Sequence, residues 1–424
     1  FGGLNAVAAL RRRIPEAKVL CVDLHKEPGG SWSDYYDYVR LHARHPSFGV
    51  SGHKWHFNDP TILAPRDDVL YHFKSFVNSM PPSYSFSGET EFLRVAEKTS
   101  SEYPLHVILR RDDAGEYDVQ ARHVINATGF FYSGHMTASE DPHNDGSSKQ
   151  LEWGTSDVSR LLQECDDSTR PRTYVVVGGG KTGIDTACYL SQHKRVEDDL
   201  VLIEGRSKLF LNRERVFPDK ANLSIWNPTL PEIYLDMILG WDGTNSKERM
   251  AEFRDRGILH SVVNPDATSY MFAHLGASEK DLVRSSAQVI SDDYFVGIED
   301  HGSTTRIKLS SGSHLDSAKE VLLINCRTST AEPRSGYLFD VHPVRPDGST
   351  TFGGLLGSSG PTNYKYTLAH TQGAQVYDRL AIYGFKHTFA DRQIDEHYVF
   401  QFILKGIANS LALMDVLSLE DMKS

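Results

Sequence analysis

Residues 174–190 impose the strongest constraint on how this chain can fold. Four residues of strand character, Tyr174–Val177, lead directly into a glycine-rich loop, and a helical pattern follows at Ala187–Leu190. Gly178, Gly180 and Gly183 fit the motif G-x-G-x-x-G. In this motif the first glycine permits a tight turn, the second lets a pyrophosphate approach the backbone, and the third lets the helix pack close to the strand. The sequence therefore predicts a dinucleotide site at a helix N-terminus; the alternative is a glycine-rich turn in an unrelated α/β domain. The predicted site residues are Gly178, Gly180, Lys181, Thr182 and Gly183.

Length and composition limit the class of protein. A chain of 424 residues corresponds to roughly two or three domains. The net charge is −11 and no basic run occurs, which argues against nucleic acid as a main partner. No apolar run has the length of a membrane span, and we recognise no signal peptide.

Cysteine and histidine spacing gives no sign of a metal site. The cysteines at 21, 165, 188 and 326 are far apart and form no C-x-x-C, so neither a dithiol redox pair nor a zinc knuckle is supported. The histidines between 42 and 56 have no diagnostic ligand spacing either, and we expect no metal. Few, scattered cysteines favour a reducing compartment, and we expect a cytoplasmic protein.

The first residues show a second pattern of the same kind. Phe1–Leu10 has the character of the end of a glycine loop and its helix, and a strand, Lys18–Val22, leads to Asp23. Gly3 and Asp23 are separated by about the twenty residues expected between the last loop glycine and a ribose-binding acid. We predict that Gly2, Gly3 and Asp23 bind a cofactor, in a fold whose first strand and first glycine precede Phe1. The alternative is a flexible N-terminus.

Two further segments complete an ordered set of motifs. Gly29-Gly30-Ser31-Trp32 follows the first acid, so that backbone and an indole can approach a cofactor through Gly30, Ser31 and Trp32. A strand at 123–125 ends in Asn126-Ala127-Thr128-Gly129. Together with the two glycine loops, this order resembles the flavin-containing monooxygenases, a family that includes Baeyer–Villiger and N-hydroxylating enzymes. The resemblance covers most of the chain, as spaced motifs.

The resemblance implies further contacts with a flavin. Thr128 and Gly129 are expected close to it, and His42 beside its ring system, with Arg44 and Ser47 as other candidates. The alternative for this region is a surface loop with ordinary aromatic packing. A strand at 351–357 and a helix at 366–380 imply flavin contacts from Gly354 and Thr367, where a helix N-terminus can stabilise reduced flavin. The chain departs from the Baeyer–Villiger and mammalian pattern at Phe131–His135, which leaves the subfamily open.

The second strand of the later half carries conflicting signals on the nicotinamide cofactor. Leu200–Ile203 ends at Glu204, and an acid there favours a free ribose 2′-OH, hence NADH. The cations Arg206 and Lys208 follow and favour a 2′-phosphate, hence NADPH. With the resemblance, we predict that Arg206 and Lys208 bind NADPH, with NADH possible.

These patterns predict an α/β protein with two Rossmann-like dinucleotide-binding domains. A discontinuous FAD domain is expected at 1–165 and 330–424, and an NAD(P)H domain at 166–329 with a helical insertion at about 218–285. Within the first domain we expect a short strand at 39–42, a helix at 67–80 and an antiparallel meander from strands at 83–87, 106–110 and 117–119.

The resemblance implies a FAD-dependent monooxygenase that uses NAD(P)H and O₂ to oxygenate a small-molecule substrate through a flavin C4a-(hydro)peroxide. The protein would position the rings and exclude water, because the flavin carries the chemistry; no catalytic residue is assigned. The alternatives are a flavin-dependent dehydrogenase or oxidase without oxygen transfer, and a non-catalytic nucleotide-binding protein. The substrate and the oligomeric state are not encoded in any pattern we recognise.

Overall fold

The computed structural model describes residues 1–45, 48–96, 105–127, 152–165, 171–217, 230–327 and 349–351, together with Phe400, Ile403, Leu404 and Ile407. The predicted contacts of Ser47, Thr128, Gly129, Gly354 and Thr367 lie outside these residues, as does the predicted helix at 366–380. In the described residues no helix is long and apolar enough to cross a membrane.

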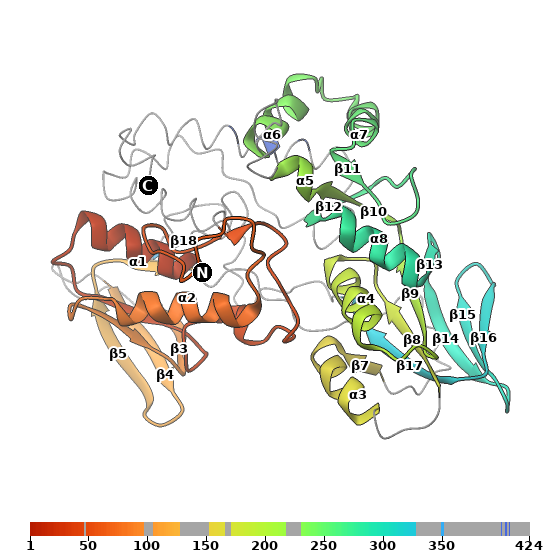
Figure 1. Cartoon of the computed structure of the whole chain (residues 1–424). Coiled ribbons are helices and arrows are strands. Elements are labelled where there is room, and N and C mark those ends of the chain that lie inside the picture. Colours follow the sequence, from red (N-terminus) through yellow and green to blue (C-terminus); the bar gives the residue numbers. More distant parts are fainter. Residues whose placement is uncertain are drawn as a thin grey trace.

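A five-stranded parallel sheet organises the second half of the chain (Figure 1). The strand order across the sheet is β13-β9-β8-β17-β7. If β8, β9, β13 and β17 are numbered 1 to 4 in chain order, these four strands have the order 3-2-1-4 of a doubly wound nucleotide-binding fold. The strands are β7 (Glu152–Gly154), β8 (Arg172–Val177), β9 (Asp199–Gly205), β13 (Gln288–Ser291) and β17 (Glu320–Asn325). The helices beside them are α3 (Val158–Cys165), α4 (Lys181–His193) and α8 (Ala277–Ser286).

The central strand is apolar throughout because the sheet is covered on both faces. Tyr174 and Val176 pack in a cluster with Ile184 and Leu190 of α4, whereas Val175 and Val177 pack on the opposite face against the β14–β15 hairpin. A strand buried on both sides is expected to be a continuous apolar run, as this one is. The covering meander consists of β14 (Phe295–Asp300), β15 (Thr305–Leu309) and β16 (His314–Ser317).

The insertion within the second half is mixed rather than purely helical. It holds α5 (Arg213–Val216), α6 (Leu230–Leu239) and α7 (Ser246–Asp255), and a three-stranded sheet of β11 (Leu259–His260), β10 (Lys208–Asn212) and β12 (Ser269–Leu275). Met237, Phe253 and Phe400 share its core, and the ring of Phe400 stacks on Trp241 with centroids 5.5 Å apart. A residue near the C-terminus therefore packs into the insertion.

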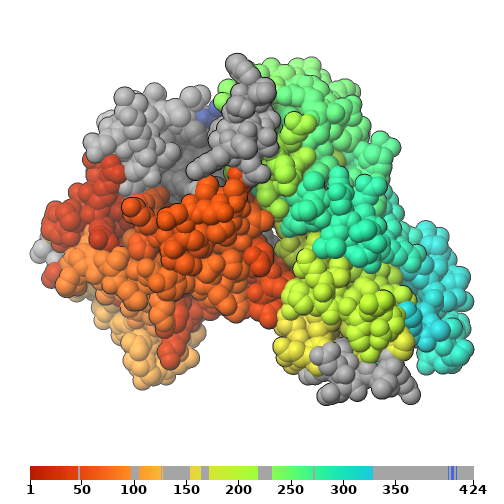
Figure 2. All heavy atoms as spheres, viewed as in Figure 1, coloured from red at the N-terminus to blue at the C-terminus, as the bar shows by residue number. Residues whose placement is uncertain are grey.

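The first half of the molecule, which also includes β18 (Ser349–Thr351) from late in the sequence, contains two parallel strand pairs beside two packed helices. The strand β1 (Val19–Val22) pairs with β2 (Tyr84–Ser87), and β6 (Val124–Asn126) pairs with β18. The helices α1 (Gly2–Arg13) and α2 (Arg66–Asn78) share a core that includes Leu4, Val7 and Phe73, and the short 3-10 helix η1 spans Gly30–Ser33. In the space-filling view the two halves lie side by side (Figure 2).

Two predictions for the first half were wrong. The segment at 83–87 does not join the meander, because β2 pairs with β1; the meander is β3 (Thr90–Ala96), β4 (Leu105–Arg111) and β5 (Gly115–Ala121). A turn separates β2 from β3: a Cβ on Gly88 would lie 2.1 Å from the Lys26 carbonyl, and Glu89 has a φ of 52°. The segment at 39–42 forms only an isolated bridge, between Arg40 and Pro65.

The predicted division of the chain into two domain ranges stays a prediction. One observation bears on where it falls. The strand β7 lies before residue 166 in the sequence, yet it is hydrogen-bonded to β17 in the sheet of the second half.

Candidate functional site

The second glycine loop is held tightly between the ends of three strands. The Gly178 and Gly179 N–H groups donate to the carbonyls of Ile203 and Glu204 at 2.9 and 3.2 Å. Gly178 has a φ of 123°, and a Cβ there would lie 2.9 Å from the Cys326 carbonyl. A Cβ on Gly183 would lie 1.8 Å from the Gly178 oxygen, so helix and loop meet without room for a side chain.

The sequence motif missed Gly179, which has the same requirement. A Cβ at this position would come within 2.7 Å of the Glu204 Cβ. The G-x-G-x-x-G pattern allows any residue there. The third consecutive glycine was the available signal.

The helix that follows presents uncapped amides. Gly180 is the N-cap of α4 and has no side chain, so the cap residue itself leaves the first-turn N–H groups unsatisfied. A helix start of this kind, directly after a parallel strand, is the usual seat of a pyrophosphate. The structure therefore assembles Gly178, Gly180, Thr182 and Gly183 as one loop, and their binding of a cofactor remains a prediction.

Lys181 points into a buried ion cluster. Its ammonium pairs with the carboxylate of Asp185 and lies 2.9 Å from Glu279 Oε1, with only 13% of the side chain exposed. Arg213 Nη2 lies 2.6 Å from the other Glu279 oxygen, and the Tyr36 hydroxyl donates to Asp185 Oδ2 at 3.0 Å. Burial alone would lower the pKa of Lys181, but the two carboxylates raise it. Its predicted role at a cofactor thus competes with two ion pairs and stays a prediction.

His42 connects the first half to β12 of the second. Its Nδ1 accepts the backbone N–H of His274 at 3.1 Å and lies 2.9 Å from His274 Nδ1. The tautomer in which His274 Nδ1 carries the proton is the one compatible with both contacts of His42 Nδ1. Burial, followed by the charges of Lys181 and Arg213, lowers the pKa of His42 to about 4, so the ring is neutral at pH 7. Contact of His42 with a flavin stays a prediction.

The end of β9 presents the residues predicted to select the nicotinamide cofactor. Arg206 is exposed, and the Lys208 ammonium donates to Ser269 Oγ at 3.2 Å. Glu204 is buried, with 4% exposure, and accepts a hydrogen bond from Ser291 Oγ at 2.6 Å. Burial raises the pKa of Glu204. Glu204 is therefore in the protein interior, whereas Arg206 is exposed to solvent and Lys208 is half-buried.

Cys326, directly after β17, lies beneath the same loop. Its N–H donates to the Val177 carbonyl at 2.8 Å, and its Sγ lies 3.5 Å from Thr186 Oγ1. Burial raises the pKa of this thiol to about 12. The pKa values of Cys188 and Cys21 are raised by burial to about 12 and about 11.

The first-half candidates also come together. Asp23 follows β1, and its Oδ1 accepts from the His25 N–H and lies 2.9 Å from His25 Nδ1. The other ring nitrogen of His25 lies 2.9 Å from Asp34 Oδ2. Burial opposes the charge on His25, yet the two carboxylates raise its pKa. A Cβ on Gly3, in the first turn of α1, would lie 3.6 Å from Ala127 Cβ, just beyond β6.

The Gly30–Trp32 segment lies near the start of α1. Gly30 has a φ of 54°, a conformation that favours glycine. The Trp32 ring packs on Phe48 at 5.5 Å, and Phe48 stacks on Phe1 at 3.9 Å. The structure therefore places Gly2, Gly3 and Trp32 in one neighbourhood, although their binding of a cofactor is not tested by these contacts. Ser31 is exposed in the same turn.

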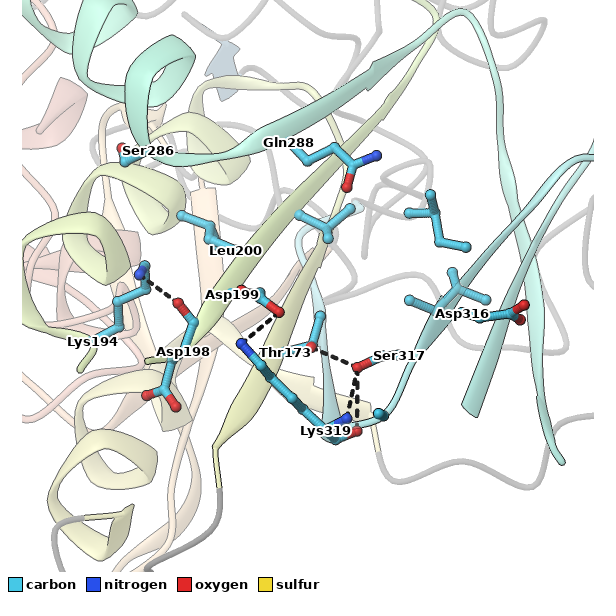
Figure 3. Close-up of a pocket in the computed structure, with 14 residues that line it drawn as sticks. Thr173, Lys194, Asp198, Asp199, Leu200, Ser286, Gln288, Asp316, Ser317 and Lys319 are labelled. Carbon is cyan, nitrogen blue, oxygen red and sulfur yellow. Dashed lines mark hydrogen bonds and ion pairs between the residues drawn. The ribbon is translucent and has the colours of Figure 1, made fainter. Parts of the chain in front are cut away.

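A separate cavity of about 500 Å³ lies at the opposite ends of the strands. Thr173 and Asp199, at the starts of β8 and β9, line it (Figure 3). Its lysines are bound internally: Lys319 Nζ lies 2.8 Å from Asp199 Oδ2, and Lys194 Nζ donates to the Asp198 carbonyl at 2.6 Å. Ligands of open α/β sheets bind at the carboxyl ends of strands, so we place the candidate site at the glycine loop. No group of three metal-ligating side chains occurs in the part of the chain that the structure describes.

Comparison with known proteins places this fold. An ornithine N-hydroxylase from Kutzneria sp. 744, solved with reduced FAD, NADP⁺ and L-ornithine, has a TM-score of 0.50 and 13% identity, over 84% of this chain and 91% of that one. An L-lysine 6-monooxygenase from Pseudomonas syringae has a TM-score of 0.46 and 12% identity, over 98% and 97% of the two chains. The first likeness confirms the predicted α/β, two-domain dinucleotide-binding fold and supports the resemblance at the level of fold.

Sequence comparison adds less. No protein-family model matches the chain. An uncharacterized protein of Mycobacterium tuberculosis is 26% identical over 215 residues, which are 48% of this chain. The match spans about a third, 36%, of the length of that relative.

Proposed function

We propose that this chain is a FAD-dependent monooxygenase that uses NAD(P)H and O₂ to oxygenate a small-molecule substrate. One observation carries the proposal: each half presents a loop glycine at a helix start and an acid at the end of the next strand. Two such sites in one chain suit one flavin and one nicotinamide dinucleotide. The fold likeness to an N-hydroxylase solved with reduced FAD and NADP⁺ supports this pairing.

The residues of the first half fit the adenosine end of FAD. The N-terminus of α1 has no side-chain cap, so its amides are available to a pyrophosphate. In the described residues Asp23 uses Oδ1 for His25, and Oδ2 accepts no hydrogen bond, which leaves an acceptor for a ribose hydroxyl. We assign Gly2, Gly3, Asp23, Gly30, Ser31 and Trp32 to FAD.

The residues of the second half fit NADPH better than NADH. The Gly178–Gly183 loop would hold the pyrophosphate, and Arg206 would pair with a ribose 2′-phosphate through charge-assisted hydrogen bonds, with Lys208 beside it. Glu204, which would repel that phosphate, points to Ser291. The bound flavin would supply the redox and oxygen chemistry. The protein would orient the two cofactors, and the His42–His274 and Tyr36–Asp185 contacts hold the halves that carry them together.

The first test is the cofactor of the purified protein. Mass analysis of the released cofactor should find FAD; FMN would contradict the dinucleotide assignment of the first half. Absence of any flavin in a protein that still binds nucleotide would favour the non-catalytic alternative.

The second test separates oxygen transfer from other flavin chemistry. Turnover of candidate amines and carbonyl compounds under ¹⁸O₂ with NADPH should place one labelled oxygen atom in the product. An oxidised product without label would favour the dehydrogenase or oxidase alternative.

The third test assigns the second loop. Gly180→Val should abolish flavin reduction by NADPH but leave FAD bound, because a side chain at 180 occupies the space needed by the pyrophosphate. Reduction at the wild-type rate would show that the nicotinamide cofactor binds elsewhere.

A further inference from the structure

The carboxylate at the end of β9 lies beneath the glycine loop rather than at its surface. Glu204 is 4% exposed, and Gly179 packs directly against it, since a Cβ on that glycine would lie 2.7 Å from the Glu204 Cβ. Glu204 Oε2 accepts a hydrogen bond from Ser291 Oγ at 2.6 Å, while Oε1 has no partner among the described residues. The Ser291 hydroxyl therefore holds the carboxylate, with a smaller contribution from the Ser207 hydroxyl, which donates to Asp292.

An irregularity in the sheet gives Glu204 this direction. The strands β13 and β9 pair in register up to Ile290 and Ile203, and the next pair is Ser291 with Gly205. Glu204 is skipped in the ladder, as in a β-bulge, and bulges redirect side chains. Gly205, with a φ of 64°, then turns the chain away from the strand.

The residues just beyond the turn direct cations outward. The Ser207 N–H and hydroxyl both donate to Asp292, at 3.1 and 2.9 Å, and so fix the backbone on one side of the exposed Arg206. Burial, followed by the charge of Arg206, lowers the pKa of Lys208, so the two cations are close enough to affect each other. The end of β9 thus has the Glu204 carboxylate turned in and the Arg206 side chain exposed, with Lys208 half-buried beside it.

We propose that Ser291 sets the preference for the nicotinamide cofactor by holding Glu204 beneath the loop. The inference rests on the proposed function, because it takes the second loop as the NAD(P)H site. An outward Glu204 would accept a hydrogen bond from a ribose 2′-OH and repel a 2′-phosphate. A buried Glu204 neither binds a 2′-OH nor repels a 2′-phosphate. The 2′-phosphate then meets Arg206 and Lys208. Because a buried carboxylate without hydrogen bonds is costly, loss of the Ser291 hydroxyl favours outward rotation. Ser291 is a positioning residue, since it acts through Glu204.

The test is a binding experiment that needs no turnover. Titration calorimetry with adenosine 2′,5′-bisphosphate and with 5′-AMP gives the ratio of the two dissociation constants for wild type, Ser291→Ala, Glu204→Gln and the double variant. The wild type should favour the 2′-phosphorylated probe. Ser291→Ala should reduce that preference roughly tenfold, the size of one charge-assisted contact. Glu204→Gln should leave the ratio near the wild-type value, and adding Glu204→Gln to Ser291→Ala should restore it.

Two controls separate the inference from its basis. Ser291→Thr keeps the hydroxyl and should retain the wild-type ratio, whereas general damage to the strand would weaken both probes equally. An unchanged ratio in Ser291→Ala, or no restoration in the double variant, would overturn the role of Ser291 alone. If Ser291→Ala does not fold, Glu204→Gln decides: selective loss of 5′-AMP affinity would show that Glu204 binds ribose and would reject the inference. A wild type that binds neither probe would remove the proposed nicotinamide site and the inference with it.

Discussion

The two halves of the molecule build a similar corner, in which a loop glycine at a helix start faces the residue that follows a parallel strand. A Cβ on Gly3 would lie 3.6 Å from Ala127 Cβ, and a Cβ on Gly183 would lie 3.7 Å from Cys326 Cβ. In the second half a Cβ on Gly183 would also lie 1.8 Å from the Gly178 oxygen. The contact with the neighbouring strand is therefore alike in both halves, and in the second half the loop itself also closes the corner.

The largest effect we expect comes from adding one methyl group to each corner. Gly183→Ala places a Cβ against backbone that cannot rotate away and should cost more than about 3 kcal/mol of unfolding free energy. Gly3→Ala meets an ordinary contact distance and should change stability by less than about 1 kcal/mol, with alanine restricting the unfolded chain. Urea denaturation without added cofactor measures both. Equal losses in the two variants would contradict the contrast.

The halves differ again in how they hold charge next to their candidate sites. Lys181→Met leaves Asp185 without a cation in a buried cluster, while Arg213 still pairs with Glu279, and we expect a loss of about 3 kcal/mol. His25→Gln removes the bridge between Asp23 and the exposed Asp34 in the first half and should cost at most about 1 kcal/mol. Denaturant midpoints of the two variants give the comparison, which fails if the His25 variant is the less stable one.

Acid should weaken the first half through His72. This ring is 1% exposed and its Nε2 accepts the Val50 N–H at 3.0 Å, so it is neutral. Burial, followed by the charges of His53, His56 and His45, lowers its pKa from 6.5 to about 4. Between these values the unfolded chain binds more protons than the folded one. Stability from this residue is therefore full above about pH 6.5 and is lost as the pH falls toward 4, by up to about 3 kcal/mol.

The matched variant for this pH effect is His72→Phe, which keeps an aromatic ring and removes the titrating group. Its unfolding free energy should depend less steeply on pH between 6.5 and 4 than that of the wild type. Glu204 has the opposite sign, because burial raises its pKa, whereas His260 and His274 of the second half share the sign of His72. Stability from Glu204 is present at low pH and is lost as the pH rises through its folded-state pKa. Identical pH slopes for His72→Phe and wild type would reject the assignment to His72.

The smallest effect we expect concerns cofactor choice. Arg206→Ala should weaken NADPH selectively by about 1.5–3 kcal/mol, or roughly tenfold to a hundredfold in kcat/KM, because a charge-assisted pair with the 2′-phosphate is lost. NADH lacks that phosphate and should be little affected. Arg306→Ala is the matched control, since Arg306 of β15 pairs with Asp316 of β16, in the meander that covers the sheet. If Arg206→Ala lowers both cofactors equally, or the wild type prefers NADH, the NADPH assignment is wrong.

Features encoded in contiguous residues were predictable from the sequence. The strand, loop and helix around Gly178–Gly183 are one uninterrupted pattern, and the structure forms all three. Pairing between distant segments was not predictable. The strand at 83–87 carries no signal for its partner, and the strands of the insertion were missed. His42 meets His274, 232 residues along the chain, and Lys181 meets Glu279, 98 residues along, so neither of these two contacts has a local signature.

Side-chain direction was the other limit. The sequence placed an acid and two cations after the second strand, but the skipped register at Glu204 decides which of them faces outward. That register depends on β13, far from Glu204 in the sequence. The predicted flavin contacts of Thr128, Gly129, Gly354 and Thr367 lie outside the described residues and stay predictions.

Burial of the thiols has a consequence for the chemical durability of the protein. With pKa values of about 11 to 12, Cys21, Cys188 and Cys326 carry almost no thiolate at neutral pH. The thiolate is the form that reacts with peroxides and alkylating reagents. We therefore expect iodoacetamide to label all three slowly, and to label Cys326, the buried one, only as fast as the protein unfolds. The cysteine beneath the glycine loop is thus kept in the form that oxidants attack least.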